Sequence, residues 1–350
     1  MLIGEDDDGR SGGKDTYDPH GIFLSDFQQQ VQDAGYKGKY FHGIKGKKFP
    51  KTFYLCGKKK NLMIIIAESG ATKCDWVVAD GGRVRLRFKT LGLNVATGAV
   101  SVIPPVVEEA VNTLKENGIS CSDVREIHFY AAGLIPVGDE KVPELARPLD
   151  VVLRSYFPDI EIEYASDLLD AARAVCGKEK GIAAILGTGS NSCFYDGVKI
   201  VKNVRSAGFI LGDEGGGTRL GRLFLSDFLK DLVPADVAEP FAKEFDVEYM
   251  TVVRSVYKSE TPAKYLGSFA PWIMQYYGKS DYVTRLVEQN FRDFIERALK
   301  QYDVVNCPVG VVGGFGYACR EILQRVGAEY GIRFSVFLPE PMEGLVKYHS

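Results

Sequence analysis

Residues 182–191 read Ile-Ala-Ala-Ile-Leu-Gly-Thr-Gly-Ser-Asn, an apolar run of strand length that ends in a turn with two glycines and two hydroxyls. Glycine lets the backbone approach an oxyanion closely, and N–H groups together with hydroxyls can hold phosphate oxygens. A hairpin tip that needs glycine for positive φ would explain the same residues. The pattern predicts a strand and then a phosphate-binding turn, made of Gly187, Thr188, Gly189 and Ser190.

A second turn of this kind occupies residues 68–73, Glu-Ser-Gly-Ala-Thr-Lys, between two runs that we expect to be strands. Glu68 ends the first run and could hold Mg²⁺ through water, because this ion binds few carboxylates and keeps several waters. A plain hairpin tip explains the turn equally well. Neither turn matches the pattern G-x-x-x-x-G-K-[ST], which excludes a P-loop enzyme. The predicted phosphate ligands are Ser69, Gly70, Ala71, Thr72 and Lys73.

The third turn, residues 212–217, reads Gly-Asp-Glu-Gly-Gly-Gly, and we expect it to follow a strand and to precede a helix from Thr218. Asp213 suits the waters of Mg²⁺, and the N-terminus of the helix offers N–H donors to an anion. An N-cap acid would explain one carboxylate but not four glycines. Three turns of complementary chemistry indicate a two-lobed fold that closes on a nucleoside triphosphate.

A pattern of hairpin and crossover occurs twice, with starts about 120 residues apart. This repeat of topology predicts an α/β fold built from duplicated β-β-β-α-β-α units. The first round has expected strands at 62–67, 76–79, 84–90, 127–131 and 160–164, and expected helices at 103–117, 142–157 and 168–176. The second has expected strands at 182–186, 192–196, 199–205, 309–312 and 333–338, and helical stretches at 218–232, 235–275, 282–300 and 319–330.

Composition places the chain among ordinary globular proteins. Its 350 residues are 45% hydrophobic and 25% charged, and this length favours two domains. A net charge of −3 makes no electrostatic case for nucleic acid or membrane as a partner. Seven scattered cysteines without a C-x-x-C pair are typical of a reduced cytoplasmic enzyme. A homodimer stays open.

Residues 1–61 differ from the rest, with an acidic Gly/Ser-rich opening and then nine lysines and no acid between Tyr36 and Lys60. Sparse apolar residues favour a disordered extension, a basic tail that touches polyanions is one alternative, and a segment foreign to the native protein is another. If the segment is foreign, Met63, which stands directly before the first expected strand, would be a natural first residue of the native protein. The predicted lobes are 62–165 and 166–350, the second with a helical insertion at about 218–300.

Phosphoryl transfer to a hydroxyl also needs a base, usually a carboxylate. Asp167 is the leading candidate, because it lies between an expected strand and an expected helix, where ligands bind in open α/β sheets. An ordinary N-cap aspartate would look the same. Asp139 is the second candidate, and Asn94 could hydrogen-bond a sugar hydroxyl. Gly313, Gly314 and Phe315 follow an expected strand and suit a nucleotide base and ribose.

These turns resemble known motifs. They resemble motifs of the superfamily that contains sugar kinases, heat-shock chaperones and actin. Within this superfamily, they resemble the BadF/BadG/BcrA/BcrD-type ATPase family and, within that family, the N-acetylglucosamine kinases. The more specific match is the pair of segments 184–191 and 211–215. The segments that resemble the phosphate-1, phosphate-2, metal-loop and adenosine motifs are Glu68–Asp75, Gly187–Asn191, Gly212–Gly217 and Gly313–Gly316.

The resemblance covers about Met63 to the end and implies a two-lobed RNase H-like fold of the actin-like ATPase type, with ATP and Mg²⁺ in a central cleft. It implies transfer of a phosphoryl group to a hydroxyl of an amino sugar. By position, Asp167 falls at a cleft aspartate, Asn94 at the sugar-binding asparagine and Asp139 near another acidic position of the sugar site, so either aspartate could be the base.

Other functions stay open at this stage. N-acetylmuramic acid is an alternative substrate to N-acetylglucosamine. An ATPase activator with an iron–sulfur cluster would use the same fold, but it needs cysteines at a subunit interface, which the scattered cysteines do not favour. A nucleotide or sugar sensor without turnover is the third reading, although no helix-turn-helix stands in the first 60 residues.

Overall fold

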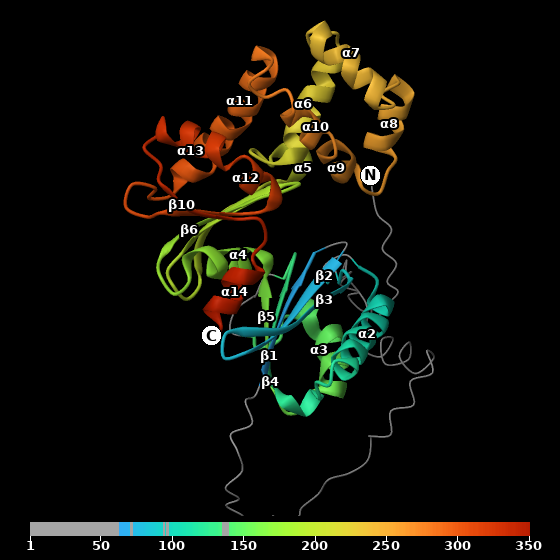
Figure 1. The fold of residues 1–350 in the computed structure, drawn as a ribbon, viewed down its shortest axis with the longest axis vertical. Coiled ribbons are helices and arrows are strands. Elements are labelled where there is room, and N and C mark those ends of the chain that lie inside the picture. Colours follow the sequence, from blue (N-terminus) through green and yellow to red (C-terminus); the bar gives the residue numbers. More distant parts are fainter. Residues whose placement is uncertain (1–62, 71–72, 94, 96–97, 135–139) are drawn as a thin grey trace, which may run out of the picture. The chain divides into compact units, whose positions relative to one another are not determined.

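Two five-stranded sheets of the same topology form the framework of the chain. In the computed structural model, the strand order of the first sheet is β3-β2-β1-β4-β5 (Figure 1). The second sheet, read from β8 to β10, has the order β8-β7-β6-β9-β10. Each sheet joins an antiparallel meander to two parallel strands. The duplicated β-β-β-α-β-α pattern and the two-lobed α/β fold are therefore confirmed.

The structure describes residues 63–70, 73–93, 95, 98–134 and 140–350. Four predicted site residues (Ala71, Thr72, Asn94 and Asp139) lie outside these ranges, as does the expected extension at 1–61. The strands are β1 (Met63–Ser69), β2 (Lys73–Asp80), β3 (Arg83–Leu91), β4 (Val124–Ala131), β5 (Glu161–Ser166), β6 (Gly181–Leu186), β7 (Ser190–Tyr195), β8 (Ile200–Val204), β9 (Val309–Val312) and β10 (Phe334–Leu338).

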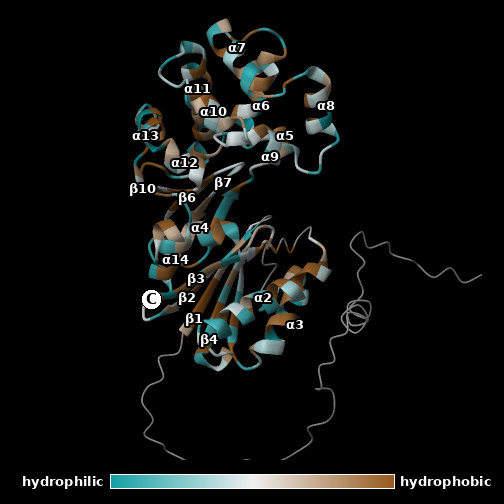
Figure 2. Ribbon diagram, turned by 45° about the vertical axis from the view of Figure 1, so that its right-hand side comes forward, coloured by the Kyte–Doolittle hydropathy of each residue, from teal (hydrophilic) through white to brown (hydrophobic). Residues whose placement is uncertain are grey.

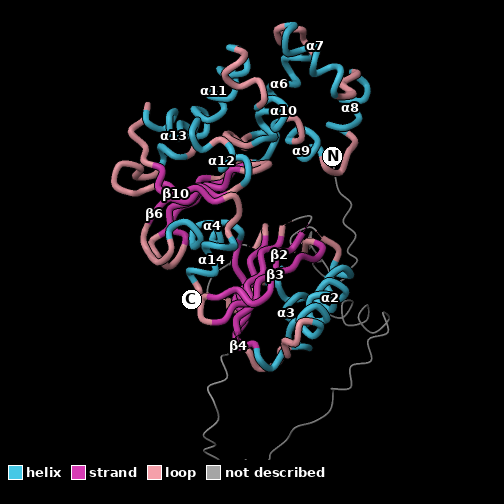
Figure 3. Tube along the Cα trace, in the orientation of Figure 1, coloured by secondary structure: helices cyan, strands magenta, loops and turns pink. Residues whose placement is uncertain are grey.

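The central strands β1 and β6 are apolar because both faces of each sheet are covered. In β1 the side chains of residues 64–67 are buried, as are those of 182–184 in β6. Figure 2 shows hydrophobic residues along the strands of the first sheet, and Figure 3 shows the strands of the two sheets as separate groups. The predicted phosphate turns at 68–73 and 187–190 follow these two central strands, so burial of β1 and β6 positions both turns.

Helices cover the sheets, and several differ from expectation. The long helices are α2 (Ile103–Glu116), α3 (Arg147–Tyr156), α4 (Asp167–Cys176), α6 (Gly217–Phe228), α7 (Ala235–Glu244), α8 (Tyr249–Tyr257), α11 (Asp281–Arg297) and α13 (Arg320–Ala328). The short ones are α5 (Gly208–Leu211), α9 (Pro262–Gly267), α10 (Ala270–Met274), α12 (Gly314–Ala318) and α14 (Met342–Tyr348), with 3₁₀ turns η1 (Val100–Val102), η2 (Cys121–Asp123), η3 (Glu144–Ala146) and η4 (Leu299–Gln301).

Proline explains two of these differences. The helix expected from Val142 begins only at Arg147, which places Pro148 in its first turn, where proline is tolerated. The helical stretch expected at 235–275 is broken into α7 to α10, and prolines again stand in the first turns of α9 and α10. A third expectation was wrong because α5, rather than a strand, leads into the turn at 212–217.

Helices α4 and α14 lie between the two sheets (Figures 1 and 3) and join them. Helix α4 contacts β5 of the first sheet and β6 of the second, and α14 packs on α4 and β1. The approach is close at Gly344, where a Cβ would lie 2.3 Å from the carbonyl oxygen of Ala174. Met342 and Leu345 are buried against β1. The sequence did not predict α14.

None of the helices in the described residues is both long enough and apolar enough to cross a membrane.

Candidate functional site

The turn at 187–190 is braced against the start of α6. The N–H groups of Gly217 and Thr218 donate to the carbonyl oxygens of Gly187 and Thr188, at 2.9 and 2.8 Å. These are the first N–H groups of the helix, which are usually free to bind an anion. The expectation that this helix N-terminus offers them to phosphate therefore needs correction. Instead, they hold the backbone of the predicted phosphate turn in place.

Asp213 lies directly beside the same turn. Its Oδ1 accepts a hydrogen bond from the N–H of Ser190 at 3.2 Å, and a Cβ on Gly189 would come within 3.0 Å of the carboxylate. A side chain at position 189 would therefore have to displace the Asp213 carboxylate. Asp213 itself has φ of +57°, a left-handed conformation that is uncommon outside glycine. Burial raises the pKa of its carboxyl group. Glu214, its neighbour in the turn, is ion-paired with Arg219 at 3.2 Å.

Asn290 is a residue of this region that the sequence did not single out. It lies on α11 and is fully buried. Its amide oxygen accepts the N–H of Gly215 at 3.0 Å, and its amide nitrogen donates to the carbonyl oxygen of Gly216 at 3.2 Å. One side chain thereby clamps the loop that carries Asp213. Because 74 or 75 residues separate the partners, nothing in the local pattern could have revealed this contact.

The first turn is closed by a hydrogen bond from the N–H of Gly70 to the carbonyl oxygen of Lys73, at 3.0 Å. The Lys73 side chain is exposed. The Ser69 hydroxyl, which was predicted to bind phosphate, is buried and hydrogen-bonded to the backbone of Leu93. The structure thus leaves the backbone of the turn and Lys73, among the described residues, as groups that could reach a ligand.

Three acids gather where β1 meets α4. Burial is the main cause that raises the pKa of Glu68 and of Asp167, and it raises the pKa of Asp170 well above its usual value. Glu68 is also repelled by Asp167, and Asp170 is repelled by both. None of the three forms an ion pair within the described part of the chain. Asp75, across the hairpin from Glu68, differs because Arg87 binds it at 2.7 Å.

These three carboxylates do not converge closely enough to form a metal-binding group among the described residues, but one of them lacks a partner. Asp170 is 2% exposed, and its Oδ1 has no hydrogen-bond partner. A buried carboxylate without a partner is costly, so such groups normally pair with a cation or stay protonated. Lys73 acts on Glu68 from a distance without neutralising the group. No hydrogen bond or ion pair joins Glu68 to Asp213 in the described part of the chain, so their shared role as metal ligands stays a prediction.

Asp167 begins α4 immediately after β5 ends at Ser166, as the sequence predicted. The Ser166 hydroxyl, not the Asp167 carboxylate, caps the helix by accepting the N–H of Leu169 at 3.1 Å. The simple explanation of Asp167 as an N-cap residue therefore fails. Its half-buried carboxylate instead interacts with the backbone N–H groups of Leu168 and of Asp167 itself, and it repels Glu68.

The predicted adenosine turn begins at Gly313, whose φ is +121°. A Cβ here would lie 2.4 Å from the carbonyl oxygen of Leu186, which is the last residue of β6. Gly314 is exposed and has open space around it. The Phe315 ring stacks on Phe291 of the core, with centroids 5.8 Å apart. The backbone of 313–314, rather than the Phe315 ring, is thus open to a ligand.

Two neighbouring glycines allow a matched test of this turn. We expect Gly313→Ala to lower the free energy of unfolding by about 3 kcal/mol or more, because it combines a strained φ with a backbone clash. Gly314→Ala, in open space at the start of a helix, should change it by less than about 1 kcal/mol. Urea unfolding of both variants checks the pair, and equal losses would contradict the geometry.

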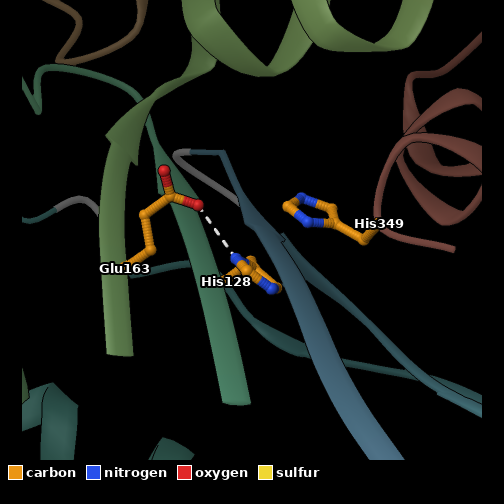
Figure 4. A group of neighbouring side chains, drawn as sticks. All are labelled: His128, Glu163 and His349. Atoms are coloured by element: carbon orange, nitrogen blue, oxygen red, sulfur yellow. Dashed lines mark hydrogen bonds and ion pairs between the residues drawn. The ribbon is translucent and has the colours of Figure 1, made fainter. Parts of the chain in front are cut away.

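A second polar cluster, made of His128, Glu163 and His349, ties α14 to the first sheet (Figure 4). His128 Nδ1 lies 2.8 Å from Glu163 Oε2, and the two imidazole rings stack with centroids 3.7 Å apart. Arg173 donates to both oxygens of Glu163, at 2.7 and 2.8 Å. Arg173 already pairs with the carboxylate, and both His128 nitrogens and His349 Nε2 already have hydrogen-bond partners. We therefore interpret the cluster as a clasp rather than a metal centre.

This clasp predicts a loss of stability in mild acid. Burial, with repulsion from His128, Arg173 and Lys178, lowers the pKa of His349 to about 3, below its ordinary value of 6.5. The unfolded chain therefore takes up a proton below pH 6.5 that the folded chain refuses, and stability falls as pH falls. The pKa of Glu163 is lowered to about 2, so this residue affects the pH dependence of stability only below its ordinary pKa of 4.5.

We expect a loss on the order of 1–2 kcal/mol between pH 6.5 and 5. Thermal unfolding of wild type and His349→Gln at pH 7, 6 and 5 measures it. The variant should lose less stability than wild type over this range. The same loss in both proteins would mean that His349 does not carry the effect.

Comparison with known proteins adds to this geometry. No protein-family model matches the chain, and no curated protein does. The chain is similar to the solved structure of the putative N-acetylglucosamine kinase from Porphyromonas gingivalis, with 38% identity and a TM-score of 0.74 over 82% of this chain and 98% of that one.

Two more distant structures share the fold. The putative N-acetylglucosamine kinase from Chromobacterium violaceum is 15% identical with a TM-score of 0.65, over 83% of this chain and 100% of that one. A glucokinase of the ROK family from Streptomyces griseus, solved with glucose and AMPPNP, is 17% identical with a TM-score of 0.50, over 82% and 97%. The duplicated sheets and their glycine-rich turns thus have the architecture of the sugar kinase superfamily. Within it, the chain belongs to the family of the P. gingivalis protein.

Proposed function

We propose that the chain transfers the γ-phosphoryl group of ATP to a hydroxyl of an amino sugar, N-acetylglucosamine. The observation that carries this proposal is the 38% identity to a protein named as a putative N-acetylglucosamine kinase, almost the whole of which is covered. As a member of this family, the chain is a phosphotransferase that acts on a sugar. The turns at 68–73, 187–190 and 212–217 support the finer assignment to the BadF/BadG-type kinases, and reduced cysteines support a cytoplasmic location.

The proposed site lies between lobes 62–165 and 166–350, with the helical insertion at about 218–300 in the second. The ATP phosphates would bind to the backbone of the turns at 68–73 and 187–190. The Lys73 side chain and the hydroxyls of Thr188 and Ser190 would add to this binding. The backbone of Gly313 and Gly314 would contact the adenosine. Glu68 and Asp213 would hold Mg²⁺, which when bound neutralises the charge on the β and γ oxygens.

Asp167 is the proposed general base. It would accept the proton of the acceptor hydroxyl as the oxygen attacks the γ-phosphorus and the bond to the β-phosphate oxygen breaks. Burial raises the pKa of Asp167, and a raised pKa moves a carboxylate toward the operating pH, which suits a base. Asp139 remains the alternative base, and Asn94 would bind a hydroxyl of the sugar.

An ADP-release assay with ATP and Mg²⁺ tests the proposal. The acceptor panel holds N-acetylglucosamine, N-acetylmuramic acid, glucosamine, N-acetylmannosamine and glucose. We expect N-acetylglucosamine to have the highest kcat/KM. Faster turnover of N-acetylmuramic acid would keep the kinase and change its substrate, and ADP release that no sugar stimulates would refute the proposal.

A further inference from the structure

We propose that Arg87 is a positioning residue that joins the two lobes beside the proposed ATP site, because its guanidinium binds one carboxylate from each of them. The inference rests on the proposed function, since it concerns the binding of ATP. Arg87 would act through Asp75 of the first lobe and Glu340 of the second, and not by contact with the nucleotide.

The contact with Asp75 lies within the first sheet. Arg87 is on β3, and its Nε and Nη2 donate to Oδ1 and Oδ2 of Asp75 on β2, at 3.1 and 2.7 Å. Asp75 is 2% exposed, and a carboxylate buried to this degree needs both a cation and hydrogen bonds. Asp75 also pairs with Glu68 in the ladder between β1 and β2. The guanidinium of Arg87 is therefore fixed to the end of the hairpin that carries Glu68 and Lys73.

The contact with Glu340 reaches the second lobe. The same Nη2 of Arg87 donates to Glu340 Oε1 at 2.5 Å, across 253 positions of the chain. Glu340 stands between β10, which ends at Leu338, and α14, which begins at Met342. One positive charge thus bridges two carboxylates that would otherwise repel each other. Such a bridge favours the arrangement of the lobes in which both acids reach the guanidinium.

The segment that carries Glu340 also touches the predicted adenosine turn. The carbonyl oxygen of Leu338 accepts the N–H of Gly313 at 2.9 Å, and only Pro339 separates Leu338 from Glu340. In the proposed function, the hairpin of the first lobe binds the phosphates of ATP, and Gly313 contacts the adenosine. A link between these two parts reduces the ordering that ATP binding would otherwise require, and so raises the affinity.

The pair between Arg87 and Glu340 is weak enough to open. Their side chains are 34% and 38% exposed, and ion pairs at such sites contribute little in water and less at high salt. We therefore expect a modest effect on ATP affinity that salt suppresses. A variant that is merely misfolded would not approach the affinity of wild type as the salt concentration rises.

The test replaces Glu340 rather than Arg87, because loss of Arg87 would leave the Asp75 carboxylate buried without its cation. Glu343→Ala is the matched control, since Glu343 is an exposed acid on α14 that forms no ion pair with any described residue. The Kd for ATP is measured by calorimetry without sugar. At about 20 mM salt, we expect Glu340→Ala to raise it about threefold to fivefold, and Glu343→Ala to change it less than about 1.5-fold. At about 0.5 M salt, Glu340→Ala and wild type should agree within about 1.5-fold.

Arg87→Lys tests whether the effect passes through the guanidinium. Lysine keeps a charge for Asp75 but lacks the fork that bonds two carboxylates at once. In this background, Glu340→Ala should raise the Kd for ATP by less than about 1.5-fold. An effect of Glu340→Ala that is equal in both backgrounds, equal to that of the control, or unchanged by salt would overturn the proposal.

Urea unfolding of wild type, Arg87→Lys, Glu340→Ala and the double variant measures the ion pair without any substrate. We expect the two substitutions to be coupled by about twofold or more in the equilibrium constant for unfolding. Strictly additive effects would show that Arg87 does not join the lobes. If wild type binds no ATP, the proposed function fails and the role of the link in ATP binding fails with it, while the coupling still decides whether the link exists.

Discussion

Replacing Asp167 with asparagine is expected to lower kcat for sugar phosphorylation about 10²–10⁴-fold, the range that a positioned base contributes. Asparagine keeps the size of the side chain but cannot accept the proton of the attacking hydroxyl. The KM for sugar should change much less, because the amide can still hydrogen-bond a hydroxyl. Steady-state kinetics with the best acceptor of the panel, together with a melting temperature that shows a folded variant, measure this effect.

Asp139→Asn is the companion variant, because the sequence leaves two candidates for the base. Loss of kcat in Asp167→Asn alone would assign the base to the start of α4, where the structure places a half-buried carboxylate that does not cap its helix. The reverse result would keep the kinase and move the base to Asp139. Full activity in both variants would rule out a carboxylate base at either position.

Asn290→Leu should cause a large loss of stability. The substitution leaves the N–H of Gly215 and the C=O of Gly216 buried without partners. At about 1–3 kcal/mol for each group, the free energy of unfolding should fall by roughly 2–5 kcal/mol, and the melting temperature by roughly 5–15 °C. Calorimetry of the purified variant measures both quantities.

Activity below the melting transition tells whether Asn290 also positions the loop. Because the loop carries Asp213, we expect a higher Mg²⁺ concentration for half-maximal rate, by about fivefold or more, in the folded variant. Gln289→Leu is the control, since Gln289 is the exposed neighbour on α11 and hydrogen-bonds only Asp293 among the described residues. A similar loss in both variants would point to a general effect on α11 instead.

Patterns that act over a few residues were readable from the sequence. The apolar runs of β1 and β6 predicted central strands, because a strand buried on both faces has no polar side. Glycines at the strand ends predicted turns, and at Gly313 the backbone of Leu186 does exclude a Cβ. The order of these elements predicted the duplicated topology, because few connections between strands and helices are allowed.

Contacts between distant segments could not be read in this way. The hydroxyl of Ser69 looked suited to phosphate, but its partner Leu93 is 24 residues away. The same holds for Asn290 and for α14, which returns from the end of the second sheet to pack on β1. A single polar residue in a helix has no periodic signal, so its partner is defined only when the elements pack.

The sequence by itself determined the turns, the order of strands and helices and the class of chemistry, because each depends on residues that are neighbours in the chain. Only the tertiary structure decided which groups are free to act. It showed that the first N–H groups of α6 and the Ser69 hydroxyl are already hydrogen-bonded, and that the Asp167 carboxylate does not cap its helix. The physical reason is that a polar group is available to a ligand only when folding has left it without a partner in the protein.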